Sequence, residues 1–343
     1  DPAPFTLDIG TTENIVINMG GGNDVFSTIG SLAGLIAVTV DGGVRVTGTV
    51  SASAAKAGAT GLRLGAGATA PVINVADGAI KAAATATDAV NVRAIQIDAG
   101  ASATTLYTSG TVSAAITGTK GEATAVLDAA GSLRNIVNAR TISATITPSD
   151  SDAVVSGKAV ALDLRANTAG VTVRQVANAS ADVTPAIVGD VLFGSGSARL
   201  DLLAGTLDGA VAFGSGADVL TIDGGAKLTG ALTDAGGGLA MTITKGRLTA
   251  TNPGTVTMTS LSVGAAGELV FTADPTAGTA TRFDVAGAAD IASGAKIGLR
   301  FASKLTSATT YTLVKAGNLT VGAVDQSLLE STPWLYKAEL RVD

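Results

Sequence analysis

The most constraining feature of this sequence is a repeat of about 20 residues in its second half. Phe193 and Phe213 occupy equivalent positions in successive units, as do Leu200 and Leu220, and Met241-Thr242-Ile243 repeats the motif that begins at Leu220. Each unit contains three short strands separated by Gly-rich turns, and the alternation along the strands indicates one buried side. A unit this small cannot bury its apolar side alone, so we expect successive units to stack.

The first half carries a longer repeat of about 30–37 residues. Leu64 and Ile97 occupy equivalent positions in two of its units, and the units that begin near Thr124 and Val160 continue it. Because the strand patterns match while the length varies, we expect insertions at one corner of each unit. The segment 147–158 is predicted to be such a loop, since it is rich in Ser, Asp, Pro and Gly.

These repeats predict an all-β fold, a right-handed parallel β-helix with a C-terminal β-rich cap. We expect about 14 turns, which at ~4.8 Å each would give a rod roughly 65 Å long. The predicted divisions are N-terminal entry strands at 1–30, long repeats at 31–186, short repeats at 187–260 and the cap at 261–343.

The composition fits a narrow core of stacked layers. Hydrophobic residues make up 46% of the chain, but aromatic residues only 3% and charged residues 15%, so small and β-branched side chains must fill the interior. No apolar run reaches the ~18 residues of a membrane-spanning helix, the longest being Leu32 to Val40. No signal-peptide pattern begins at Asp1, so we expect any signal to have been removed or to lie before it. The absence of Cys excludes disulfides.

The C-terminal segment 261–343 differs from the rest of the chain. Six of the eleven aromatic residues lie in it, namely Phe271, Phe283, Phe301, Tyr311, Trp334 and Tyr336. A better-filled core at one end is what a capping module needs, since the open end of a β-helix exposes unpaired backbone groups. We therefore expect this segment to be the most stable part of the chain and to nucleate its folding.

Three stretches together resemble an autotransporter passenger domain of the alphaproteobacterial, sphingomonad type. They are the repeat LRLGAGATAPVIN with GAIKAAATA, the array from Val188 to Gly230, and the terminal GAKIGLRFASKLTSATTYTLVKAGNLTVG with LLESTPWLYKAELRVD. The last is similar to a pertactin-like autochaperone module. The resemblance implies a β-helix carried outward by a C-terminal outer-membrane translocator barrel, which is missing after Asp343. It implies that the chain is a cleaved passenger or part of a longer protein.

Catalysis is not expected, because the chain has no His and therefore lacks the commonest general base and nucleophile activator. The spacing of Gly194-Ser195-Gly196-Ser197 and Gly214-Ser215-Gly216-Ala217 does not match a nucleophile elbow, so both are interpreted as turns. A net charge of −6 without a basic stripe argues against nucleic acid as a partner.

Acidic residues offer the remaining chemical hypotheses. Five aspartates in consecutive short repeats are candidates for a column of paired carboxylates, as a glycosidase needs: Asp201, Asp208, Asp218, Asp223 and Asp234. The preferred interpretation is that each bonds to its own turn. The segment Gly20 to Phe26 is similar to a single calcium-binding nonapeptide, but no second copy follows, so a turn is preferred and no cofactor is predicted.

The predicted function is that of an exported passenger, a structural or adhesive β-helix at the cell surface, on the extracellular face of a Gram-negative outer membrane. We expect it not to be an enzyme and not to span the membrane itself. Its expected partners are the translocator, and a cell-surface, glycan or self-association partner. A surface-layer or filament subunit and a polysaccharide-degrading β-helix enzyme are the alternatives.

Overall fold

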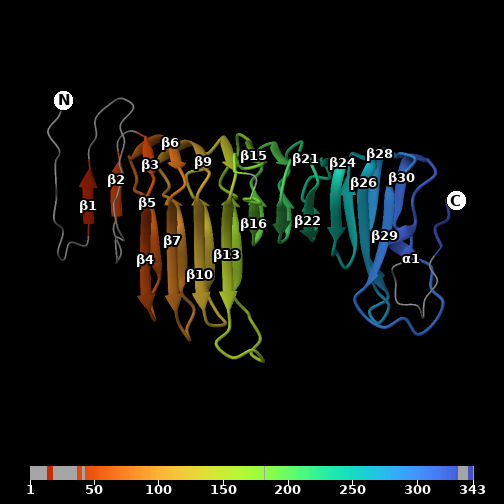
Figure 1. The fold of residues 1–343 in the computed structure, drawn as a ribbon, viewed down its shortest axis with the longest axis horizontal. Helices are drawn as coiled ribbons and strands as arrows, with labels where there is room; N and C mark the ends of the chain where they lie inside the picture. Colours follow the sequence, from red (N-terminus) through yellow and green to blue (C-terminus); the bar gives the residue numbers. More distant parts are fainter. Residues whose placement is uncertain (1–13, 18–36, 41–42, 181, 331–338, 343) are drawn as a thin grey trace.

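The computed structural model describes residues 14–17, 37–40, 43–180, 182–330 and 339–342. Across this part of the chain the protein is a parallel β-helix, in which the strands of each turn lie beside those of the next along one rod (Figure 1). Each turn has three strands, which form three faces around a central core. The predicted all-β fold is confirmed.

The first face is a stack of parallel strands. Its separate strands are β3 (Val44–Val46), β6 (Thr69–Val75), β9 (Ser102–Thr108), β12 (Asn135–Asn138), β15 (Val171–Gln175), β18 (Ala198–Leu202) and β21 (Val219–Ile222). The second face follows in each turn with β4 (Thr49–Ala55), β7 (Ala79–Thr85), β10 (Thr111–Thr117), β13 (Thr141–Thr147), β16 (Ala186–Val188), β19 (Thr206–Asp208) and β22 (Ala226–Gly230).

The third face completes each turn. Its strands are β5 (Ala59–Leu64), β8 (Asn91–Ile97), β11 (Glu122–Asp128), β14 (Lys158–Leu164), β17 (Asp190–Phe193), β20 (Val211–Phe213), β23 (Leu232–Asp234) and β25 (Thr255–Met258). Before the first complete turn, β1 (Asn14–Ile17) pairs in parallel with β2 (Ala37–Val40), which lies beside β5. The predicted entry strands at 1–30 fall outside the described residues except for β1.

Near the C-terminus single strands continue around a corner and belong to two faces. These are β24 (Ala240–Ala250), β26 (Ser260–Asp274), β28 (Arg282–Ile291) and β30 (Val314–Val321), with β29 (Lys296–Phe301) completing the second face. The strand β24, for example, pairs with β21 through residues 240–243 and with β22 through residues 246–250. The short β27 (Thr279–Ala280) forms an antiparallel hairpin with the end of β26.

The register confirms the repeats that the sequence predicts. Leu64 lies opposite Ile97, Thr124 opposite Val160, and Leu200 opposite Leu220. One inward-facing column on the first face marks eleven layers: Val44, Ile73, Leu106, Ile136, Val173, Leu200, Leu220, Met241, Leu261, Ala289 and Leu319. The strands β1 and β2 mark two further layers before β5, so the described strands mark 13 layers, close to the roughly 14 turns expected.

The extra residues of the first four turns build a lateral extension, which we call the fin. It consists of the C-terminal halves of β4, β7, β10 and β13 and the facing N-terminal halves of β5, β8, β11 and β14, and it projects to one side of the rod (Figure 1). Its interior is a second apolar cluster dominated by alanine: Ala52, Ala59, Ala82, Ala84, Ala86, Val90, Val92, Ala114, Ile116, Ala123 and Ala144. Short side chains allow its two sheets to pack closely.

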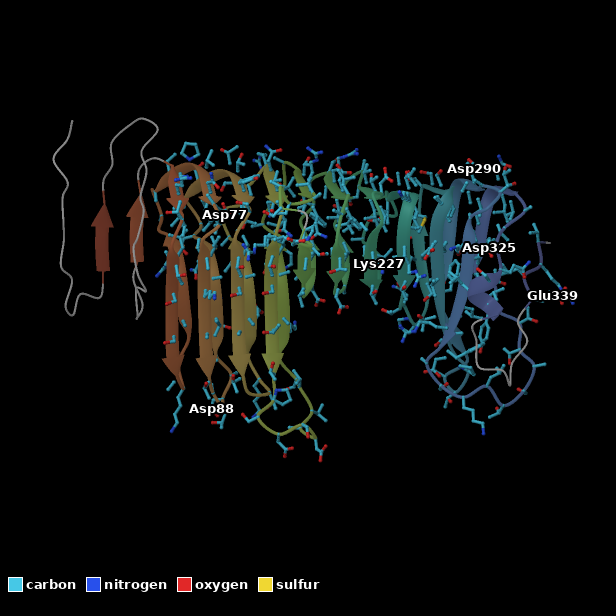
Figure 2. All side chains as sticks on the ribbon, viewed as in Figure 1. Asp77, Asp88, Lys227, Asp290, Asp325 and Glu339 are labelled. Carbon is cyan, nitrogen blue, oxygen red and sulfur yellow. The ribbon has the colours of Figure 1, made fainter. Side chains whose placement is uncertain are left out.

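The tip of the fin is made of loops between the second and third faces. Asp88 lies there (Figure 2), and the predicted loop around 147–158 runs between the end of β13 at Thr147 and the start of β14 at Lys158. The predicted corner insertions are thus confirmed for the first four turns. The fifth turn differs, because its long connection lies between β15 and β16, at the corner of the first and second faces.

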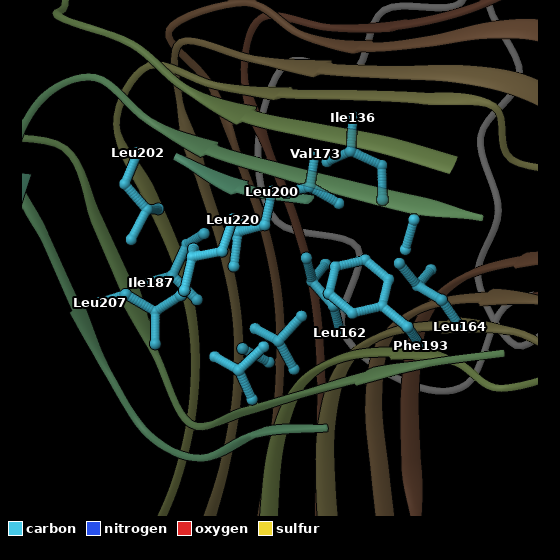
Figure 3. Packing of buried hydrophobic residues seen from close by; sticks show 14 of the residues in the cluster. Ile136, Leu162, Leu164, Val173, Ile187, Phe193, Leu200, Leu202, Leu207 and Leu220 are labelled. Atoms are coloured by element: carbon cyan, nitrogen blue, oxygen red, sulfur yellow. The ribbon is translucent and has the colours of Figure 1, made fainter. Parts of the chain in front are cut away.

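The main core runs the length of the rod and is filled by stacked aliphatic side chains (Figure 3). Phe193 and Phe213, which belong to successive turns, stack with ring centroids 5.2 Å apart and planes 8° from parallel. At the corner between the first and second faces the core contains a polar ladder. There Asn138 Nδ2 donates to Gln175 Oε1 at 3.0 Å, and Gln175 Nε2 donates to the carbonyl oxygens of Ala204 and Thr206.

The C-terminal end of the rod is packed differently from the rest. Phe271 and Phe283 are fully buried, with ring centroids 5.2 Å apart. The helix α1 (Ser327–Glu330) packs against β29, where Leu328 lies over Gly298. The cap is therefore β-rich, as predicted, with one short helix at the end of the described stack.

Candidate functional site

The five aspartates considered as a carboxylate column do not form one. Asp201 lies opposite Thr221 in the next layer, so the position that follows it in register carries no carboxylate. Asp208 is an exposed residue at the end of β19 on the second face, whereas Asp234 ends β23 on the third face. The spacing of the aspartates in the sequence differs from the layer repeat, and they are consequently distributed around the rod. Asp234 is close enough to Asp218 to raise its pKa, but the side chain of Asp218 is fully buried.

Two of these aspartates bond to their own turns, as preferred from the sequence. Asp223 Oδ1 accepts a hydrogen bond from the backbone N–H of Gly224 at 2.7 Å. Asp234 accepts one from Gly236 N at 3.2 Å and another from Leu239 N at 2.7 Å. Backbone N–H groups in a tight turn are natural partners of an Asp side chain.

Asp218 has a different role, which its sequence neighbours did not indicate. Its side chain is fully buried, and Oδ1 accepts a hydrogen bond of 2.6 Å from Ala198 N in the preceding layer. The other oxygen, Oδ2, is buried and has no hydrogen-bond partner among the described residues. Burial raises the pKa of Asp218, the bond from Ala198 opposes this, and the nearby Asp234 raises it further.

The Gly-Ser segments occupy equivalent corners of successive layers, between the third and first faces. Ala217 N donates to Ser197 Oγ at 3.3 Å, and a Cβ on Gly214 would collide with the carbonyl oxygen of Gly194. These residues are turns, as predicted. The calcium-like segment Gly20 to Phe26 lies outside the described residues, and the part of the chain that the structure describes holds no group of three or more acidic residues arranged to bind a metal.

The first face carries a group of outward side chains that the linear sequence did not reveal. Two adjacent rows cross its strands from β3 to β21, and we call them together the arginine–tyrosine strip. One row is Arg45, Asn74, Tyr107, Val137, Arg174, Asp201 and Thr221, and the other is Val72, Thr105, Asn135, Thr172, Arg199 and Val219. The strip holds three arginines and one aspartate, a net charge of +2 on a chain whose net charge is −6.

Two of the arginines share one carboxylate. Arg199 Nε donates to Asp201 Oδ2 at 2.8 Å, and Arg174 Nε lies 4.0 Å from the same oxygen. The Asp201 side chain is only 8% exposed, whereas those of Arg174 and Arg199 are about half exposed. The hydrogen bond to Asp201 raises the pKa of Arg199, so its charge is permanent. The carboxylate orients the two guanidinium groups while part of each stays in solvent.

Tyr107 and Val72 add exposed apolar surface to the same strip. They are 38% and 42% exposed, and they lie on neighbouring strands, β9 and β6. Most large apolar side chains of the described residues are buried, so an aromatic ring on this face stands out. The strip is not visible in the linear sequence, because Tyr107 and the arginines lie on different strands that are separated by a turn or more of the chain. The signal available was the repeat, since aligning Val173 with Leu200 places Arg174 opposite Asp201.

No helix among the described residues is long and apolar enough to cross a membrane. Comparison of the chain with protein-family models, with curated proteins and with solved structures finds no match.

Proposed function

We propose that this chain is the exported passenger of a bacterial autotransporter and acts at the cell surface as a structural or adhesive β-helix. The observation that carries the proposal is the stack of eleven layers whose C-terminal end contains the packed aromatic pair Phe271 and Phe283. In such a rod each layer contacts only its neighbours, so the repeated layers form long, continuous outer faces. These faces are surfaces on which a partner can bind. The likeness of the terminal segment to an autochaperone module supplies the link to export.

The proposal includes the absence of catalysis. The chain has no His, and the five aspartates that offered an acid–base pair are distributed over different faces and corners. To test for catalysis, the purified chain is incubated with a panel of acidic and neutral glycans and the release of reducing sugar is measured. We expect no release above that of the denatured protein. A clear signal abolished by Asp201→Asn or Asp218→Asn would contradict it.

The position of the chain is tested on intact cells of the source organism. An antibody raised against the purified chain should label unpermeabilised cells, and external protease should remove the label while a cytoplasmic marker stays intact. Labelling only after lysis would overturn the proposal. Deletion of the chain should reduce attachment of the cells to a surface without changing their growth rate, which separates an adhesive role from a general defect.

A further inference from the structure

The arginine–tyrosine strip combines positive charge, an exposed aromatic ring and hydrogen-bonding side chains along the rod. We propose that it binds an extended acidic polysaccharide, a glycan with carboxylates on its sugar rings, laid across the strands of the first face. This inference rests on the proposed function, because a surface-exposed rod is where such a glycan is accessible. The proposed function specifies neither a ligand nor a binding site, and this inference supplies both.

The anionic groups of the glycan are recognised by Arg174 and Arg199. Each guanidinium has five N–H donors, and the contact with Asp201 engages the Nε group of each. The remaining donors belong to side chains that are about half exposed, at 49% and 50%. A planar guanidinium fork binds a carboxylate with two parallel hydrogen bonds, which an ammonium group does not. Because the buried Asp201 carboxylate holds Arg199 by a hydrogen bond and attracts Arg174 at 4.0 Å, these side chains lose less entropy on binding.

The sugar rings are recognised by the middle of the strip. Tyr107 exposes an aromatic face with an apolar body and a polar hydroxyl, a combination suited to a ring that is apolar on one side and hydroxylated at its rim. Asn74 and Asn135 lie on the strands directly on either side of Tyr107. The amide group of the exposed Asn135 supplies a donor and an acceptor for sugar hydroxyls, whereas the side-chain oxygen of Asn74 is buried.

The spacing along the rod favours a polymer over a single sugar. Tyr107 and Arg174 are two layers apart in the same row, which is about 10 Å at the ordinary strand spacing. Arg45 lies two layers from Tyr107 on the opposite side, at a similar distance. A glycan chain that crosses the strands can therefore contact the ring at its centre and an arginine on each side, whereas a monosaccharide reaches one of them.

The small positive charge of the strip favours an acidic polysaccharide over a nucleic acid as its ligand. A net charge of +2 is too small for tight binding to duplex DNA, whose affinity depends on neutralising many closely spaced phosphates. A polysaccharide has widely spaced carboxylates and sugar faces between them. Tyr107 has a role in that complex and none in the neutralisation of phosphates.

The experiment measures binding of the purified chain to fluorescently labelled polygalacturonate, with dextran as the neutral polymer and duplex DNA as the competing polyanion. We expect saturable binding to polygalacturonate that weakens as the NaCl concentration rises, and no binding to dextran. The double variant Arg174→Gln/Arg199→Gln should lose at least tenfold in affinity. Tyr107→Ala should lose several-fold with the charge unchanged.

The matched control is Arg63→Gln/Arg165→Gln. These arginines are 48% and 61% exposed and are also paired with aspartates. Arg63 lies on β5 of the third face, and Arg165 directly follows β14 of the same face, so neither belongs to the strip. The control should keep its affinity within twofold. Equal losses in the two double variants would overturn the proposal, because binding would then depend on the total charge. Binding to DNA as tight as to polygalacturonate and insensitive to Tyr107→Ala would overturn it as well.

Asp201 is tested as a positioning residue. Asp201→Asn raises the net charge of the strip but removes the shared anchor of the two guanidinium groups. We expect weaker binding at an unchanged circular dichroism spectrum, and tighter binding would contradict the positioning role. The two proposals fail separately. A chain found at the cell surface that does not bind polygalacturonate refutes this inference alone, whereas a chain that binds it but is found only inside cells refutes the proposed function.

Discussion

At the scale of single residues, the interior depends on polar side chains that bond between layers. Asn138 and Gln175 are fully buried yet fully engaged, since each bonds both to the other and to backbone carbonyl groups of the next turn. A buried polar group without a partner is destabilising, so such a ladder specifies which layers stack on each other. Asp218 is one of several residues with a buried polar atom that has no hydrogen-bond partner among the described residues, in its case Oδ2.

The ladder gives the first prediction. Asn138→Ala should lower the stability of the chain by about 2–3 kcal/mol, because it removes the bonds to Gln175 and to the Ala186 carbonyl and leaves both groups buried without a partner. The shift of the urea midpoint measures this. Asn135→Ala, on the same strand but exposed, should change the midpoint little. Equal shifts for the two variants would show that the ladder does not stabilise the fold.

Asp218 gives a prediction about pH. Its pKa in the folded state is raised by burial, so the folded chain binds the proton more tightly than the unfolded chain does. Stability therefore falls as pH rises from the unfolded pKa through the folded one, and above both the carboxylate carries its full penalty. The melting temperature of Asp218→Asn should exceed that of the natural chain at neutral pH. The difference should shrink as pH falls through the raised folded pKa and be smallest below the unfolded pKa of about 4. A difference that is constant with pH would contradict this.

At the scale of elements, the corners set how closely the turns stack. In the short repeats the Gly-Ser corners of successive layers lie directly over each other, and Gly194, Gly214 and Gly236 belong to three such corners. The absence of a side chain allows backbone to pack on backbone. The register of β17 against β20, and the stacking of Phe193 on Phe213, depend on this close approach.

Gly214→Ala should therefore be destabilising, by about 1–3 kcal/mol, because the added methyl group collides with the backbone of the preceding corner. Gly254→Ala is the matched control, since its Cβ would enter open space and its backbone has no positive φ. Thermal unfolding of both variants measures the difference. If Gly254→Ala were as destabilising as Gly214→Ala, backbone crowding would not be the cause.

At the scale of the whole molecule, the rod has two parts with different cores. The fin has an interior of alanine and valine, whereas the cap buries Phe271 and Phe283 and has α1 packed against β29. Large aromatic side chains bury more apolar surface per residue than alanine does. In a stack where each layer contacts only its neighbours, such differences remain local rather than being shared by the whole chain.

The cap should therefore be the most stable region. Hydrogen exchange of the native chain should be slowest in β26, β28 and β29 and faster in the C-terminal halves of β4, β7, β10 and β13 that form the fin. Limited proteolysis should leave a C-terminal fragment. A resistant fragment that contains the fin and lacks the cap would contradict both the stability order and the nucleating role of residues 261–343.

The sequence by itself determined the repeats, and through them the fold. In a parallel stack each strand lies beside the equivalent strand of the next turn. The spacing of about 20 residues between Leu200 and Leu220 therefore already specifies which residues lie opposite each other. The absence of His and Cys likewise excluded whole classes of chemistry without any structure. The Gly-Ser corners and the loop around 147–158 follow from turn chemistry, which is local.

The tertiary structure alone decided which side chains become lateral neighbours. Asp201 and Asp218 look alike in the sequence, but one is held between arginines and the other is sealed in the interior. Tyr107 and Arg174 are far apart in the sequence and lie in one row only because the intervening turns have unequal lengths that still restore the register. The number of residues in each turn can be read from the sequence. Whether the additional residues form part of the fin or a loop at another corner is determined by packing.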